Sequence, residues 1–248
     1  MGRYILLVLV FYALALSLAL YRKAPRSRKT GPATPLGERL RLLLIGATGG
    51  SGLKILEQAL AQGHEVTALV RTPEKLKITH PKLRVVPGDV LDYPSVETAM
   101  QGQEAVLCAL GHRRFLGPSS VLSEGTRNIL HAMKRCGVPR LIVESSLGVG
   151  NVVGRLGILA TIFSVPLVLP FYFWDRVRQE KLVEEGDRDW VIVRPATLTN
   201  GAARGEYQHG DVGSYFLPTR VSRADVADFM LKQLHDDFYL GTAPGICY

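Results

Sequence analysis

From Arg41 onward the sequence alternates short β-branched or leucine-rich runs with amphipathic stretches. This alternation is typical of βαβ units, which build a parallel sheet. The runs predict strands over residues 41–45, 65–70, 83–86, 105–110, 140–144 and 190–193. The amphipathic stretches predict helices over residues 51–62, 95–100, 119–136, 176–185 and 223–235.

Six strands with intervening helices predict a single α/β domain with a doubly wound parallel sheet over residues 41–248. The sequence shows no internal repeat. Of its 248 residues, 47% are hydrophobic and 21% are charged. That composition supplies a large core and excludes a disordered or fibrous protein.

A glycine-rich loop follows the first predicted strand directly and opens the first predicted helix. It reads Gly46-Ala47-Thr48-Gly49-Gly50-Ser51-Gly52, a G-x-x-G-x-x-G pattern. Glycines are needed where the backbone turns tightly and approaches a pyrophosphate, which then lies on the N–H groups of the helix N-terminus. The position between strand and helix therefore predicts the dinucleotide site of a Rossmann NAD(P)-binding fold. The expected cofactor-binding residues here are Gly46, Thr48, Gly49, Gly50, Ser51 and Gly52.

The end of the second predicted strand favours NADP(H) over NAD(H). An NAD site places Asp or Glu about 20 residues after the glycines to bind the ribose hydroxyls. Val70-Arg71-Thr72 stands there instead. A guanidinium attracts a 2′-phosphate and offers no acceptor to a 2′-hydroxyl, and Lys75 adds a second positive charge. The alternative is that Arg71 is simply a solvated residue at a strand end.

Two further loops at predicted strand ends complete the expected cofactor site. Asp89 and Val90, after Gly88, are expected near the adenine, and Ala109, Leu110 and Gly111 near the nicotinamide-side ribose. In open α/β sheets, ligands bind outside the carboxyl ends of the strands. Asp89 has a second interpretation, in which it only caps a turn.

The positive charge does not indicate a nucleic-acid partner. The formal net charge is +8, but residues 1–29 hold six basic residues and no acid, so the rest of the chain carries only +2. That remainder is too small and too evenly spread for a phosphate-binding surface. The three cysteines, Cys108, Cys136 and Cys247, lie far apart without metal-ligand spacing, so we expect no metal site and a reducing compartment.

An apolar segment at the N-terminus predicts a membrane anchor. Residues 4–21 form 18 positions without charge, glycine or proline. As a helix they would span roughly 27 Å at about 1.5 Å per residue. A cleaved signal peptide is the alternative, but its apolar region is shorter and ends in a small-x-small site. We therefore expect an anchor over 1–21 and a basic juxtamembrane linker over 22–40 that can touch anionic lipid. Five basic residues follow the segment, which places the Rossmann domain in the cytosol.

Several blocks along the chain, from about residue 42 to the C-terminus, resemble the atypical short-chain dehydrogenase/reductase superfamily. Within it they are most similar to the NADPH-dependent flavin reductase/biliverdin-IXβ reductase group. The blocks are GATGGSG at 46–52, VTALVRTPEKL at 66–76, VVPGDVLD at 85–92, SEGTRNILHAMKRCGVPRLI at 123–142 and VSRADVADFML at 221–231. The resemblance implies one NADPH-binding domain with an open pocket over the nicotinamide, which accepts flavins, tetrapyrroles or other flat conjugated molecules.

The Tyr-x-x-x-Lys pair of the wider superfamily is missing from the expected place. Tyr172 and Arg176 stand at that spacing instead. Arginine cannot be deprotonated, but it can hold a nearby phenolate by charge. Tyr172 is thus a candidate proton donor, and the alternative is a packed aromatic residue. The missing lysine argues against routine alcohol dehydrogenation.

Ser146 follows the fifth predicted strand and matches, by the resemblance, the family's active-site serine. There it would orient the nicotinamide or hydrogen-bond the acceptor, although its hydroxyl could also just cap the following loop. After the sixth predicted strand, Arg194-Pro195 is similar to a superfamily loop that closes over the cofactor.

A second apolar stretch, residues 156–174, is uncharged for 19 positions. A membrane span there would separate the strand at 190–193 from the other five, so the sheet could not close. We expect instead a helix-loop flap beside the nicotinamide, which is either buried or dips into the bilayer. In the second case the acceptor would be lipophilic, such as a quinone.

These observations predict a membrane-anchored NADPH-dependent oxidoreductase that passes hydride to a flat conjugated or lipophilic acceptor. One alternative is a non-catalytic NADP(H)-sensing module of the NmrA-like type. Another is an isomerase or epimerase of the same superfamily, in which the hydride is returned to the substrate.

Overall fold

The computed structural model describes residues 33–111, 118–152, 155–157 and 170–248, together with isolated positions at 8, 10–12, 15–16, 18, 21 and 161. Most of the predicted anchor over 4–21 and of the apolar stretch over 156–174 lies outside the described residues. Among the residues that are described, no helix has both the length and the apolar character needed to cross a membrane.

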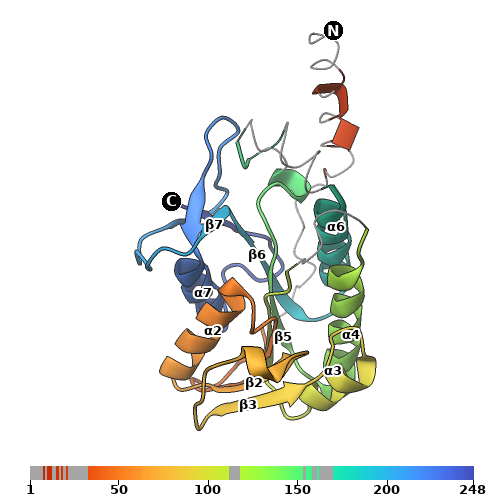
Figure 1. Ribbon diagram of the computed structural model, residues 1–248, viewed down its shortest axis with the longest axis vertical. Helices are drawn as coiled ribbons and strands as arrows, with labels where there is room; N and C mark the ends of the chain where they lie inside the picture. The colour runs from red at the N-terminus through yellow and green to blue at the C-terminus, as the bar shows by residue number, and fades with distance from the viewer. Residues whose placement is uncertain are drawn as a thin grey trace.

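An eight-stranded sheet forms the centre of the fold, in the order β3-β2-β1-β4-β5-β6-β10-β8 (Figure 1). All its neighbouring strands pair in parallel except β10 and β8, which are antiparallel. The strands are β1 (Arg41–Ile45), β2 (Glu65–Val70), β3 (Leu83–Pro87), β4 (Ala105–Cys108), β5 (Arg140–Glu144), β6 (Asp189–Pro195), β8 (Gln208–Gly210) and β10 (Gly245–Cys247). The predicted doubly wound parallel sheet is confirmed.

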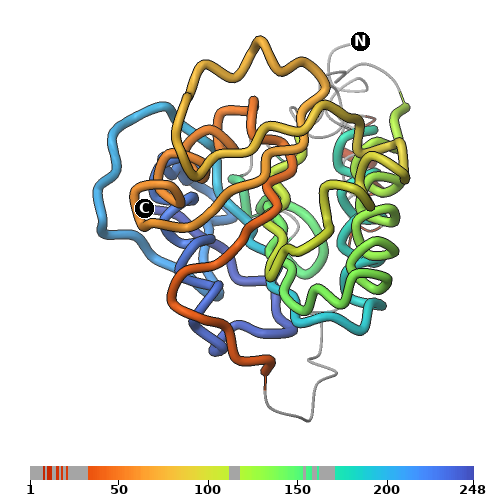
Figure 2. Tube along the Cα trace, turned by 90° about the horizontal axis from the view of Figure 1, so that it is seen from below, coloured from red at the N-terminus to blue at the C-terminus, as the bar shows by residue number. Residues whose placement is uncertain are grey.

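Helices cover both faces of this sheet. The two that pack together on one face are α2 (Gly50–Ala61) and α7 (Arg223–Lys232). The other face carries α3 (Tyr93–Met100), α4 (Val121–Cys136) and α6 (Pro170–Glu185). Figure 2 shows the same two layers from below, with α7 on one side and α4 and α6 on the other.

The leucine run of β1 explains why the strand is central. Leu42 and Leu44 point into the core layer under α2 and α7, whereas Leu43 and Ile45 point into the layer under α3, α4 and α6. All four side chains are at most 2% exposed. A strand buried on both faces needs a continuous apolar run rather than alternation with polar residues.

The structure corrects several predicted boundaries. The fourth strand ends at Cys108 rather than at 110, because Ala109 and Leu110 belong to the loop at the sheet's carboxyl edge. The helix predicted over 176–185 begins six residues earlier, at Pro170. Residues 170–174 of the expected flap are therefore the first turns of α6.

Several short elements were not predicted from the sequence. Strands β7 (Thr197–Thr199) and β9 (Arg220–Ser222) form a separate two-stranded parallel sheet. Two short 3-10 helices, η1 (Pro73–Lys75) and η2 (Gly150–Val152), occupy connections. The C-terminus is fixed because β10 lies between β6 and β8 in the main sheet.

A buried ion pair ties α6 to the sheet. Glu180 and Arg194 are 0% and 1% exposed in their side chains, and Arg194 donates to Glu180 Oε1 at 3.0 Å and Oε2 at 2.7 Å. Ser145 Oγ also donates to Glu180 Oε1, at 2.6 Å. The pair thus joins α6 to β6 and to the end of β5, directly behind the carboxyl edge.

We expect Glu180→Ala to destabilise the fold by about 3–5 kcal/mol, because it leaves a buried guanidinium without its counter-charge. Urea unfolding measures the change. Lys181, the next residue of the same helix, forms an exposed ion pair with Glu185. Lys181→Ala should therefore lower the free energy of unfolding by less than about 1 kcal/mol. If both substitutions had equally small effects, the buried pair would not be what holds α6 to the sheet.

Candidate functional site

The site lies where the order of the strands reverses. From β1 the chain proceeds outward to β2 and β3, whereas β4 lies on the other side of β1 and leads to β5 and β6. The loops after β1 and β4 consequently diverge and leave a crevice at the carboxyl edge, where this fold class binds dinucleotides. Two adjoining hollows occupy this crevice, and Gly49, Ala109, Leu110 and Gly111 line both.

The glycine loop has the geometry of a phosphate cradle. Gly46 has φ +89°, and a Cβ on Gly52 would lie 2.1 Å from the carbonyl oxygen of Gly46, so neither position accepts a side chain without moving the backbone. No side chain caps the N-terminus of α2, which begins at Gly50, and no acid lies in its first turn. Its backbone N–H groups are therefore available to an anion. This cradle fits a dinucleotide pyrophosphate.

The first hollow, of about 290 Å³, fits the adenosine half. Its lining includes the predicted residues Gly46, Thr48, Arg71, Asp89 and Val90. Arg71 is half exposed, and its guanidinium lies 4.0 Å from the Asp89 carboxylate. A side chain this exposed can turn toward a 2′-phosphate at little cost.

Two of the predicted residues at this end have other surroundings. Lys75 ends η1 and is absent from the lining of the hollow, so the structure does not bring it to the site. Asp89 Oδ1 accepts a hydrogen bond from Leu91 N at 3.0 Å, so its carboxylate does cap a turn while it lines the hollow.

The second hollow, of about 470 Å³, brings the predicted catalytic residues together. Ser146, Tyr172 and Arg176 line it, with Gly50 and Ser51 from the glycine loop. The rest of its wall is largely apolar: Leu156, Phe173, Pro195, Ala196 and Leu198. A flat, weakly polar molecule therefore fits beside the nicotinamide end of the crevice.

Tyr172 and Arg176 are in direct contact. Arg176 Nε donates to the Tyr172 hydroxyl at 3.0 Å, and its guanidinium carbon lies 5.1 Å from the centre of the tyrosine ring. The guanidinium also donates to the carbonyl oxygens of Glu144 at 2.6 Å and Leu110 at 2.9 Å. Arg176 is 3% exposed. It therefore positions Tyr172 and joins the end of β5 to the loop after β4, and it does not reach substrate freely.

Ser146 is half-buried and faces the second hollow, but its hydroxyl donates to the backbone oxygen of Leu147 at 2.9 Å. A hydroxyl used in this way can still accept a hydrogen bond from a cofactor or acceptor. The neighbouring Ser145 is buried. Both serines line the second hollow, but the Ser145 hydroxyl donates to Glu180, so Ser146 is the one more open to a ligand.

Glu144 is a site residue that sequence analysis missed, because it read only as the last residue of a buried strand. Its carboxylate lines the second hollow, is 5% exposed and accepts a hydrogen bond from Ser51 Oγ at 2.7 Å. Burial raises the pKa of Glu144 above its usual value, against the opposing effects of Ser51, Arg176 and Arg223. The Ser51 hydroxyl is engaged inside the protein, so Ser51 would bind cofactor through its backbone.

Arg223, the first residue of α7, is the second missed residue. Its side chain crosses the glycine loop, where a Cβ on Gly50 would lie 2.6 Å from Arg223 Nε. Its guanidinium donates to Asn200 Oδ1 at 2.6 Å and lines the second hollow. The residue lies in the VSRADVADFML block, so a signal for it was present in the sequence. It supplies a positive charge where a pyrophosphate would lie.

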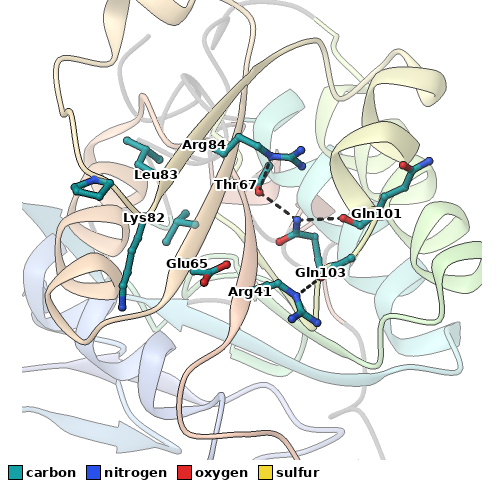
Figure 3. Close-up of a pocket in the computed structure, with 11 residues that line it drawn as sticks. Arg41, Glu65, Thr67, Lys82, Leu83, Arg84, Gln101 and Gln103 are labelled. Carbon is teal, nitrogen blue, oxygen red and sulfur yellow. Dashed lines mark hydrogen bonds between the residues drawn. The ribbon is translucent and has the colours of Figure 1, made fainter.

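A third hollow, of about 510 Å³, lies at the opposite edge of the sheet (Figure 3). Its polar side chains bind one another: Arg84 Nε and Gln103 Nε2 approach Thr67 Oγ1 at 3.3 and 3.1 Å. It surrounds the amino ends of β1, β2 and β3, where this fold class does not bind ligands. We therefore do not assign it to the site.

Comparison with known proteins agrees with this geometry. The model of a family described as NAD(P)H-binding matches residues 46–237. An uncharacterised chloroplastic protein of Arabidopsis thaliana, At2g34460, is 30% identical over 66% of this chain and 61% of its own length. Reductase pytE of Aspergillus terreus is 26% identical over 84% of this chain and 97% of its own length. The chain thus spans about three fifths of the first of these relatives.

Solved structures share the fold. Anaerobillin reductase ChuY of Escherichia coli O157:H7 has a TM-score of 0.69 at 23% identity, and covers 83% of this chain and 96% of its own. A short-chain dehydrogenase/reductase of Veillonella parvula in complex with NADP has a TM-score of 0.68 at 19% identity, with 83% and 93% covered. The predicted resemblance to atypical short-chain dehydrogenases/reductases and the predicted nicotinamide cofactor are confirmed.

We expect Arg71→Ala to weaken NADPH binding by about tenfold or more and NADH binding far less, because only NADPH carries the 2′-phosphate. Fluorescence titration with both cofactors measures the ratio. Lys75→Ala is the matched control, since Lys75 lies outside the hollow, and should change neither affinity by more than about twofold. Equal losses for both cofactors in Arg71→Ala would exclude the 2′-phosphate role.

Arg223→Gln should give the opposite pattern. The pyrophosphate is common to both cofactors, so we expect NADPH and NADH to bind about 10–100-fold more weakly, the worth of a hydrogen bond to a charged group. The same titration measures this effect. Unchanged affinities, or a loss confined to NADPH, would show that Arg223 does not contact the pyrophosphate.

Proposed function

The chain belongs to the NAD(P)H-binding family, and on that premise we propose that it is an NADPH-dependent reductase that passes a hydride to a flat conjugated acceptor. The observation that carries the proposal is the second hollow, which continues the dinucleotide crevice and places Tyr172, Ser146 and an apolar wall beside its nicotinamide end. Relatives named as reductases support the same reaction class.

When bound, NADPH supplies the hydride, and the protein supplies position, polarity and a proton. The glycine loop and the N-terminus of α2 bind the pyrophosphate, and Arg71 selects the phosphorylated ribose. Ser146 orients the acceptor or the nicotinamide by a hydrogen bond. The Tyr172 hydroxyl gives a proton to a heteroatom of the acceptor, and Arg176, 3.0 Å from that oxygen, stabilises the phenolate that results.

The shape and polarity of the second hollow favour flavin, tetrapyrrole or quinone-like acceptors. Its lining is apolar on the side of Leu156, Phe173 and Leu198. The charged side chains of Glu144 and Arg176 are held by protein partners. Arg223 is placed toward the pyrophosphate rather than toward the acceptor. A conjugated ring system therefore fits against this wall, and any charged substituent of the acceptor must stay outside it, where it keeps its water.

We also propose that residues 4–21 anchor the chain in a membrane with the Rossmann domain in the cytosol. The support is the run of 18 uncharged residues and the excess of basic residues after it. An anchored enzyme would meet its acceptor at the bilayer, which agrees with an apolar hollow.

The test follows NADPH oxidation by the full chain in detergent, with FMN and a short-chain quinone as acceptors, while cofactor binding is monitored by fluorescence. Oxidation with either acceptor is the expected result. Tight binding without turnover of any acceptor would favour the NADP(H)-sensing alternative, and no binding would overturn the cofactor assignment itself.

Tyr172→Phe separates the proton donor from the packed aromatic residue. The ring keeps its edge contact with Phe173, at 5.4 Å between centres, so packing is preserved. We expect kcat to fall about 100-fold, the lower end of general acid catalysis, with an unchanged affinity for NADPH. An unchanged kcat would show that the tyrosine only packs.

A further inference from the structure

Large apolar side chains are exposed on two segments beside the second hollow. Phe171 and Trp174 on α6 are 44% and 54% exposed. Tyr215, Phe216 and Leu217, between β8 and β9, are 53%, 77% and 70% exposed. We refer to these five residues as the apolar rim. Soluble proteins rarely expose several large apolar side chains together, and such a cluster is typical of an interaction surface.

Both segments adjoin the lining of the second hollow. On α6, Tyr172 and Phe173, which lie between or beside the exposed residues, line the hollow. On the other side Leu156 lines the hollow and forms a β-bridge with Ser214, directly before Tyr215. Leu156 also packs against Phe173. Each segment of the rim therefore adjoins residues that line the second hollow, although the rim residues themselves lie outside its lining.

One described residue of the N-terminal apolar segment, Leu16, contacts the protein beside the second hollow. Leu16 packs against the small cluster of Val149 and Phe173, together with Leu156 and Tyr172. Figure 1 places the described N-terminal residues, the start of α6 and the blue loop between β8 and β9 at the same end of the molecule. An anchor that begins here holds this end against the membrane.

Charges at the rim suit a bilayer surface. Arg178 is exposed and shares a surface hollow with Phe171 and Trp174. The acid beside the other segment, Asp211, is paired with Arg155. Aromatic residues flanked by arginine are typical of the membrane–water interface. The six basic residues within 1–29 add attraction to anionic lipid.

We propose that the apolar rim inserts into the interface of an anionic bilayer, so that the acceptor enters the second hollow directly from the lipid. This inference rests on the proposed anchoring and specifies the acceptor class as lipid-dissolved. Phe171 and Trp174 enter from one side of the second hollow and Phe216 and Leu217 from the other. The hollow is then continuous with the apolar phase.

Trp174 is a built-in probe of this arrangement. The chain has two tryptophans, and the other, Trp190, is 5% exposed in the core. The full chain is placed in vesicles of phosphatidylcholine and phosphatidylserine that carry a nitroxide on the acyl chains. We expect strong quenching of the wild type, and its loss in Trp174→Phe, because nitroxides quench only within contact range.

A matched control moves the probe to the far edge. Phe238 is 79% exposed and lies in the turn that precedes Gly241. This turn is joined to the start of β6, because Gly241 N donates to Trp190 O. The start of β6 is at the edge of the sheet opposite the rim. In Trp174→Phe combined with Phe238→Trp, the new tryptophan should be quenched by aqueous iodide and not by the lipid nitroxide. Equal lipid quenching at both positions, or none at Trp174, overturns the proposal. Protection of Trp174 that depends on protein concentration instead of lipid assigns the rim to a second copy of the chain and also overturns it.

A kinetic measurement tests the route of the acceptor. Phe216→Asp with Leu217→Asp leaves the lining of the hollow intact, since neither residue belongs to it. We expect about a tenfold lower rate with a long-chain quinone dissolved in the vesicle and an unchanged rate with FMN, because the charges keep the rim out of the apolar phase. Equal rates with the quinone would contradict the route. Absence of turnover with both acceptors would refute the reductase and leave the quenching result to decide the docking.

Discussion

A single buried guanidinium, that of Arg176, holds the candidate active site together. It donates to the carbonyl oxygen of Glu144, the last residue of β5, and to that of Leu110 in the loop after β4. It also donates to the hydroxyl of Tyr172 on its own helix. Backbone carbonyls at strand ends have no partner within the sheet, and a buried one without a partner would cost free energy. One side chain thus satisfies two backbone carbonyls at the carboxyl edge of the sheet and holds Tyr172 beside the crevice.

Other buried polar side chains of α6 also bind neighbouring parts of the fold. Asp175 accepts hydrogen bonds from the backbone of Leu122 and Ser123, so its carboxylate caps the N-terminus of α4. Glu180 pairs with Arg194 behind the hollow. The face that α6 turns toward the protein is therefore largely polar and charged, with Phe173 and Val183 as its buried apolar residues. Its first turns expose Phe171 and Trp174 to the surface. Most soluble helices bury apolar side chains and expose polar ones, and α6 largely reverses this pattern. Its buried polar side chains position the groups that line the second hollow.

The same inversion explains what sequence analysis could and could not predict. The strands β1, β2 and β5 and the glycine loop were predicted correctly because their signals are local: apolar runs, and glycines between strand and helix. The start of α6 at Pro170 was missed because a helix with buried charges and exposed aromatic rings has no amphipathic period to detect. Strands β7 to β10 are three residues each and exist only through partners distant in the chain, as when Ile246 pairs with Pro195.

The site residues likewise fall into those that local sequence indicates and those that depend on contacts between distant parts of the chain. Arg71 could be placed from its spacing after the glycines, whereas Glu144 needed the knowledge that its side chain meets Ser51 from a loop 93 positions earlier. Arg223 was visible as part of a motif but not as a neighbour of Gly50, because that contact depends on how α7 packs against α2.

The crevice has a gradient of polarity along its length, and this gradient constrains how the protein meets its ligands. Its adenosine end carries the half-exposed Arg71 and Asp89, which require water and a charged ligand. Its other end is walled by Leu156, Phe173 and Leu198 and adjoins the apolar rim. A hydrophilic cofactor and a lipophilic acceptor can therefore approach the same reacting point from opposite ends, each through surroundings that match its own solvation. The proposed reaction at a membrane surface needs this separation, because neither ligand then crosses the other's solvent.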